Sequence, residues 1–109
     1  MTEFVKAAAV ADIKPGAMKR VEIEGKRLLI ANVDGRFYAT QDRCTHEEAS
    51  LSQGVLRGEW VKCPLHGSRF NVRTGEVLEE PAEEPLKTHA VRVQGEDILV
   101  KLDARTGKT

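Results

Sequence analysis

The residue types best suited to metal chemistry gather in one stretch of this sequence. Residues 43–68 read RCTHEEASLSQGVLRGEWVKCPLHGS and hold both cysteines of the chain and two of its three histidines. Cys44 and His46 are separated by one residue, and Cys63 and His66 by two. Each pair offers one soft thiolate and one borderline imidazole, and the short spacing lets both side chains of a pair converge on metal. The sequence therefore predicts that Cys44, His46, Cys63 and His66 are metal ligands.

The mixed composition of the two pairs bears on which metal they bind. A single Zn²⁺ ion accepts two cysteines and two histidines in a tetrahedron, but zinc fingers usually pair cysteine with cysteine and histidine with histidine. Mixed pairs suit two metals, because two loops that meet tip to tip place both cysteines on an inner metal and both histidines on an outer one. This arrangement describes a [2Fe–2S] cluster. Zinc stays open here, as does a disulfide between Cys44 and Cys63, which would leave both histidines unexplained.

The stretch resembles the Rieske family, whose pattern is Cys-x-His, about sixteen residues, then Cys-x-x-His. The segments CTH and CPLHGSRFNVRTGEV agree with it, and the resemblance covers essentially the whole chain. A length of 109 residues narrows the resemblance to the stand-alone Rieske ferredoxins of bacterial aromatic-ring-hydroxylating dioxygenases, including the biphenyl and carbazole systems. It implies a one-electron carrier that is not itself an enzyme. Such a carrier accepts electrons from an NAD(P)H-dependent flavoprotein reductase and passes them to a terminal oxygenase.

Histidine ligands make an electron easier to add. An oxidised [2Fe–2S] cluster with four thiolate ligands is negatively charged, whereas replacing two of the thiolates by neutral imidazoles leaves it neutral. The reduction potentials of Rieske centres accordingly lie at roughly −150 to +300 mV. High-potential members of the family carry two further cysteines, a tyrosine and a serine around the cluster. The matching positions here hold Ala49, Leu65, Phe70 and Ser68. The resemblance thus implies no disulfide, a Ser68 hydroxyl bonded to a bridging sulfide, and a potential low in the Rieske range.

The elements that position these residues are predicted to be short strands. The segment RVEIEGKRLLIANVDGRFYAT reads as three strands with turns at Glu24-Gly25 and Asp34-Gly35. Further strands are expected at EWVKC, SRFNV, HAVRV and DILVKL, whereas residues 44–57 lack a period-two pattern. Helix signals are scarce. The fold class is therefore all-β: an antiparallel sandwich or small barrel, which the resemblance specifies as the Rieske iron–sulfur fold.

One domain is expected, with a cluster-binding subdomain at about 43–74 inserted into a base domain of about 2–42 and 75–103. We call residues 76–84 the acidic segment; it reads as a loop, because prolines cannot donate to a ladder and its glutamates repel one another. Trp60 is expected to anchor the core, and His89 is given no role. Electron transfer favours transient docking of partners at the cluster tip, which comprises His46, Glu47, Glu48, Pro64, Leu65 and His66.

Composition limits the remaining partners and the location. Lysine plus arginine and aspartate plus glutamate both number 17, so no global positive charge draws the chain to nucleic acid or to anionic lipid. The amino terminus lacks the apolar core of a signal peptide, and no stretch approaches the length of a membrane span. We therefore expect a soluble cytoplasmic protein whose thiols are kept reduced. A monomer is expected as well, since no dimerisation surface is apparent.

Two rival functions stay open at the level of sequence. A zinc-stabilised interaction module would use the same four ligands without redox chemistry. A Rieske-type accessory subunit of another redox system, such as a nitrite-reductase small subunit, or a redox sensor would share the fold. The aromatic compound downstream and the identity of the reductase are not encoded in these residues.

Overall fold

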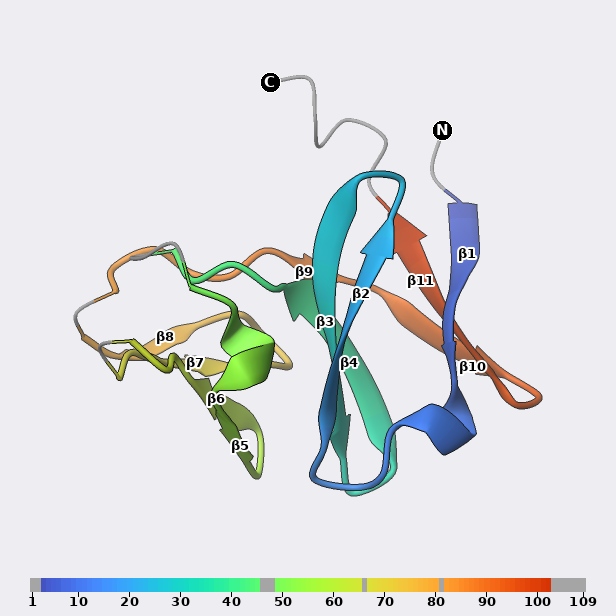
Figure 1. Ribbon diagram of the computed structural model, residues 1–109, viewed down its shortest axis with the longest axis horizontal. Coiled ribbons are helices and arrows are strands. Elements are labelled where there is room, and N and C mark those ends of the chain that lie inside the picture. Colours follow the sequence, from blue (N-terminus) through green and yellow to red (C-terminus); the bar gives the residue numbers. More distant parts are fainter. Residues whose placement is uncertain (1–2, 46–48, 66, 81, 103–109) are drawn as a thin grey trace.

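Antiparallel strands make up most of the computed structural model, which describes residues 3–45, 49–65, 67–80 and 82–102 (Figure 1). The described part contains no α-helix, only the 3₁₀ turns η1 (Val10–Asp12) and η2 (Leu51–Gln53). None of its helices is long and apolar enough to cross a membrane. The strands are β1 (Glu3–Ala9), β2 (Met18–Ile23), β3 (Lys26–Val33), β4 (Arg36–Gln41), β5 (Val55–Arg57), β6 (Trp60–Lys62), β7 (Arg69–Asn71), β8 (Val77–Glu79), β9 (Thr88–His89), β10 (Val91–Gln94) and β11 (Asp97–Leu102).

The strands form three antiparallel sheets, which confirms the predicted all-β class. Their orders are β1-β11-β10, β2-β3-β4-β9 and β5-β6-β7-β8. Figure 1 shows the third sheet to one side of the other two. The turns after β2 and β3 lie where the sequence places them. Glu24 and Gly25 have φ of 53° and 81°, and Asp34 and Gly35 have 53° and 92°. Two successive positive values are what a two-residue hairpin turn requires, because its twist then matches that of the strands.

Strand β3 lies between two hydrophobic cores. Leu28 and Ile30 pack on one side with Ile98 and Val100 of β11, in a core that joins the first two sheets. The alternate residues of β3 pack on the other side with side chains of the third sheet and of the ligand loops. Because successive side chains of a strand point to opposite faces, one apolar strand serves both cores. We call these the base core and the site core.

Three strands lie where the sequence predicted none. β1 was not anticipated, β5 falls within the stretch that lacks a period-two pattern, and β8 contradicts the prediction that the whole acidic segment is a loop. β5 and β8 are the two edges of the third sheet, and β8 pairs with β7 across a register shift. Edge strands tolerate charge and irregularity, which is why pattern reading misses them. The predicted strand HAVRV is divided into β9 and β10 at Ala90. The predicted division into base domain and cluster-binding subdomain stays a prediction.

Candidate metal centre

The two cysteines begin loops that close in the same way. Cys44 follows β4, and its backbone N–H donates to the carbonyl of Ala49 at 3.0 Å. Cys63 follows β6, and its N–H donates to the carbonyl of Ser68 at 2.8 Å. In each loop the bond joins the cysteine to the residue five positions later, so both loops are closed at their base. The predicted ligands His46 and His66 belong to these two loops by sequence but lie outside the described residues.

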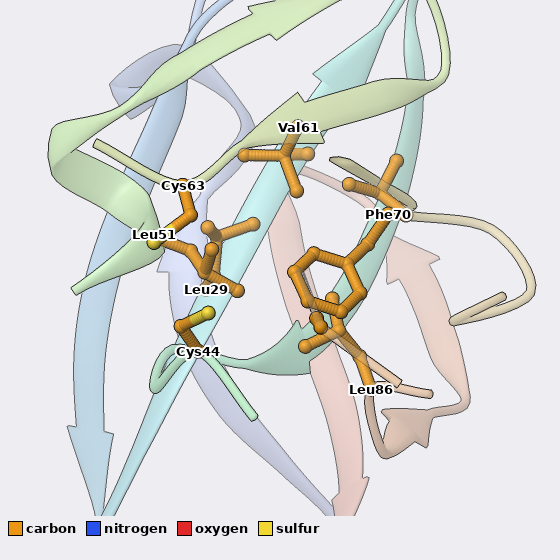
Figure 2. Close-up of a cluster of buried hydrophobic side chains, with 10 residues drawn as sticks. Leu29, Cys44, Leu51, Val61, Cys63, Phe70 and Leu86 are labelled. Atoms are coloured by element: carbon orange, nitrogen blue, oxygen red, sulfur yellow. The ribbon is translucent and has the colours of Figure 1, made fainter. Parts of the chain in front are cut away.

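The structure brings Cys44 and Cys63 into one buried cluster. The two residues are 3% and 2% exposed, and neither forms a disulfide. Figure 2 shows the two side chains near Leu29 and Leu51, with Phe70 beside them in the same cluster. Burial among apolar side chains keeps water from a centre held there and makes charge on it costly. The structure therefore places the two cysteines together, and their role as cluster ligands stays a prediction.

Asp42 organises the first loop. Its carboxylate accepts a hydrogen bond from the Ser50 hydroxyl and one of 2.9 Å from the Ser52 N–H, and its own carbonyl accepts the Leu51 N–H at 2.7 Å. Asp42 is 1% exposed, so these bonds satisfy a carboxylate that would otherwise be buried at high cost. They hold η2 against the end of β4 and thereby place Cys44. The sequence reading missed this residue, although an aspartate followed by a Ser-x-Ser step is a possible signal.

Two glycines permit the close packing of the second loop. Gly67 has a φ of +82° and donates its N–H to the Cys63 carbonyl at 3.2 Å. A Cβ placed on Gly54 would lie 1.9 Å from the Lys62 carbonyl oxygen. A side chain at Gly54 would thus force the η2 segment away from the strand that delivers Cys63. Gly67 therefore needs the backbone freedom of glycine, and Gly54 needs its lack of a side chain.

The acidic segment contacts both ligand loops. The Thr45 hydroxyl donates to the Glu84 carbonyl at 2.8 Å, and the Ala82 N–H donates to the Ser68 hydroxyl oxygen at 2.9 Å. Ala82 is 1% exposed and belongs to the site core together with the two cysteines. Figure 1 shows the chain after β8 returning past the same end of the molecule as the ligand loops. The segment is therefore a third wall of the site, a role that its composition alone does not reveal.

The residues present suit a sulfide-bridged iron centre. Such a centre needs thiolate ligands, and the two buried thiols of Cys44 and Cys63 would supply them. Ser68 is 1% exposed, and its hydroxyl oxygen accepts a hydrogen bond from the Ala82 N–H. Within the described part of the chain its hydrogen has no acceptor. A buried donor without an acceptor is costly, and an inorganic sulfide or a thiolate between the loops would satisfy it.

The other predicted residues have mixed outcomes. Phe70 is fully buried in the site core, whereas Leu65 is 55% exposed on the second loop. The expectation for Trp60 is wrong: it belongs to neither core, lies partly exposed on the third sheet, and carries the Arg69 guanidinium 4.4 Å from its ring centre. Because Val61 fills the inward position of β6, its neighbour Trp60 must point to the outer face. Glu47 and Glu48, predicted at the docking tip, lie outside the described residues.

Comparison with known proteins identifies the family. The Rieske [2Fe–2S] domain matches residues 3–100. The chain is 48% identical to the biphenyl dioxygenase ferredoxin subunit of Pseudomonas sp. strain KKS102, over 89% of this chain and 90% of that protein. It is 43% identical to the ferredoxin component of biphenyl 2,3-dioxygenase from Rhodococcus jostii strain RHA1, over 92% and 94%.

A solved structure gives the same result. It is the complex of reduced oxygenase and oxidised ferredoxin in carbazole 1,9a-dioxygenase, and the matching chain is 41% identical. The TM-score is 0.85, and the match covers 89% of this chain and 91% of that one. Sequence, fold and the buried thiol pair agree. The chain belongs to the Rieske [2Fe–2S] domain family and is an electron carrier of the ferredoxin type rather than a catalyst.

Proposed function

We propose that this protein carries single electrons from an NAD(P)H-dependent flavoprotein reductase to the terminal oxygenase of an aromatic-ring-hydroxylating dioxygenase. The observation that carries the proposal is the near full-length match to ferredoxin subunits of biphenyl dioxygenases, at 48% and 43% identity. The burial of Cys44 and Cys63 in one site supports it, because a carrier needs a redox centre shielded from water on all sides but one. We further propose that the protein acts as a cytoplasmic monomer.

We propose Cys44, His46, Cys63 and His66 as the four cluster ligands. When bound, the [2Fe–2S] cluster accepts and releases one electron at a time. The chain's own residues then have separate tasks. Asp42 and the closed backbone loops hold the two cysteines, the hydrogen of the Ser68 hydroxyl is available to an acceptor in the site, and the apolar site core excludes water. We place partner docking at the tips of the ligand loops, where Pro64 and Leu65 are exposed.

A redox titration followed by EPR tests the proposal. Anaerobically purified protein should give a reduced-state signal with average g below about 2 and nitrogen coupling from histidine, at a midpoint low in the Rieske range. Reconstitution with a flavoprotein reductase and the terminal oxygenase of a biphenyl dioxygenase should then yield NADH-dependent product formation that requires this protein. Colourless protein that contains zinc and no labile sulfide would instead establish the interaction module. A cluster that supports nitrite reduction and no oxygenase turnover would establish an accessory subunit.

A further inference from the structure

A groove of about 510 Å³ lies beside the second ligand loop, against the edge of the third sheet. Val55 of β5 and Leu65 line it, and they are 47% and 55% exposed, among the most exposed large apolar side chains of the described residues. Cys63 also lines the groove, so an occupant would lie next to the loop that holds the redox centre. Exposed apolar side chains that face one hollow are typical of a binding surface.

The charge of the groove selects its occupant. Lys62 pairs with Val55 across the strands, and among the described residues that line the hollow it is the one side chain, apart from the Cys63 thiol, that can ionise. Among the described residues no carboxylate forms an ion pair with its ammonium group. Arg69, next to Lys62 in the same row, is by contrast paired with Glu79 at 2.9 Å. The groove therefore offers apolar contact and one positive charge that is free to pair with a partner.

The backbone keeps this hollow open. Gly54 and Gly67 lie on its wall, and a Cβ on Gly67 would come within 3.3 Å of the Lys62 side chain. Both positions also restrict substitution, through the close approach of Gly54 to the Lys62 carbonyl and the positive φ of Gly67. The shape of the groove is thus built into the same loop geometry that places Cys63.

We propose that this groove receives the terminal oxygenase, through an apolar side chain of the oxygenase flanked by a carboxylate that pairs with Lys62. This inference rests on the proposed function and adds a binding site to it. The oxygenase is favoured over the reductase because the solved complex of a 41% identical ferredoxin is one with its oxygenase. A small apolar anchor with a single charge pair suits a partner that must bind and leave at every turnover.

Matched aspartate substitutions test the groove. Val55→Asp places a charge in it, whereas Val93→Asp makes the same change on β10 at a residue of nearly equal exposure, 49%. The probe is the purified terminal oxygenase of a biphenyl dioxygenase, titrated with holoprotein at low salt. We expect Val55→Asp to raise the KM for ferredoxin about tenfold with kcat, midpoint potential and EPR spectrum unchanged, and Val93→Asp to leave all four unchanged. Equal effects of the two variants would overturn the assignment of the groove.

A charge reversal provides an independent readout in case Val55→Asp loses its cluster. Lys62→Glu should raise the same KM, and the effect should shrink as salt is added; Lys101→Glu on β11 is the control. Two other outcomes would assign the groove to another occupant and overturn the proposal. The first is that the substitutions change only the kinetics with the reductase; the second is that sedimentation shows a dimer of the wild-type protein that the substitutions weaken. If wild-type protein passes no electrons to the oxygenase, the proposed function fails first. Wild-type turnover with insensitive variants rejects the groove alone.

Discussion

Ser68 connects two parts of the site through one hydroxyl group. Its oxygen accepts the Ala82 N–H of the acidic segment, and its hydrogen is left for an acceptor inside the site. We expect Ser68→Ala to lower the midpoint potential by roughly 40 mV, since a hydrogen bond contributes about 1 kcal/mol and about 59 mV is a tenfold change for one electron. The potential falls because the Ser68 hydroxyl, as a donor, stabilises the reduced cluster, which is the more negative form, and the substitution removes that stabilisation.

Stability supplies the second readout of that substitution. Ser68→Ala leaves the buried Ala82 N–H unsatisfied, so the free energy of unfolding should fall by about 1–3 kcal/mol. Thr40→Val is the control, because Thr40 is also fully buried and donates to the Gln41 carbonyl at the end of β4. It should lower stability without moving the potential. An unchanged potential in Ser68→Ala would show that the hydroxyl does not face the cluster.

Phe70 offers the opposite test, the addition of a donor. The ring is fully buried in the same core as both cysteines, so a new hydroxyl there finds either a ligand sulfur or no partner. We expect Phe70→Tyr to raise the midpoint potential by roughly 40 mV, on the same conversion of one hydrogen bond. Phe37→Tyr, which adds a hydroxyl beside the base core, is the control in the redox titration. Lower stability with no change in potential would mean that the ring points away from the sulfur.

Among the elements, the turn that contains η2 depends on one side chain. Asp42 binds Ser50 and the Ser52 N–H, and these bonds hold the first ligand loop against the end of β4. Asp42→Ala leaves both donors without their acceptor and should lower the free energy of unfolding by about 1.5–3 kcal/mol, the range for hydrogen bonds to charged groups. Asp42→Asn keeps one acceptor and should lose less.

The cluster reports the same effect of Asp42 by a separate measurement. Bleaching of the visible absorbance by a chelator should be faster in Asp42→Ala than in wild type, with Asp42→Asn between them. Asp34→Ala, in the exposed turn between β3 and β4, serves as the matched control. If both Asp42 variants bleach at the same rate as the wild type and the control, the turn does not hold the ligand loop in the way that the hydrogen bonds suggest.

Sequence reading is reliable where a local rule is strong. Asp34-Gly35 predicts a turn because few residues adopt two positive φ values in succession, and the structure has the turn at these two residues. It fails where tertiary pairing decides. Val77 to Glu79 carry no strand pattern of their own and become β8 by pairing with β7. Asp42 acquires its role only after the chain folds back, because its partners Ser50 and Ser52 lie eight and ten residues further along the chain, beyond the span of a single turn.

The whole molecule is built around two cores that share β3. The base core joins the first two sheets, and none of the described residues of the ligand loops belongs to it. The site core includes both cysteines, and it joins the third sheet to the back of β3. Metal binding to such ligands supplies folding free energy directly, because the preformed site is absent from the unfolded chain. The two cores should therefore differ in how far they depend on the cluster.

We expect removal of the cluster to unfold the third sheet and spare the base sheets. In hydrogen exchange on chelator-treated protein, amides of β6 and β7 should lose protection by several orders of magnitude, because the site core loses the centre that holds its two ligand loops together. Amides of β2 and β11 should keep most of theirs, since Val21, Ile98 and Val100 pack in a core to which neither cysteine belongs. Uniform loss of protection across all three sheets would show instead that both cores fold as one cooperative unit.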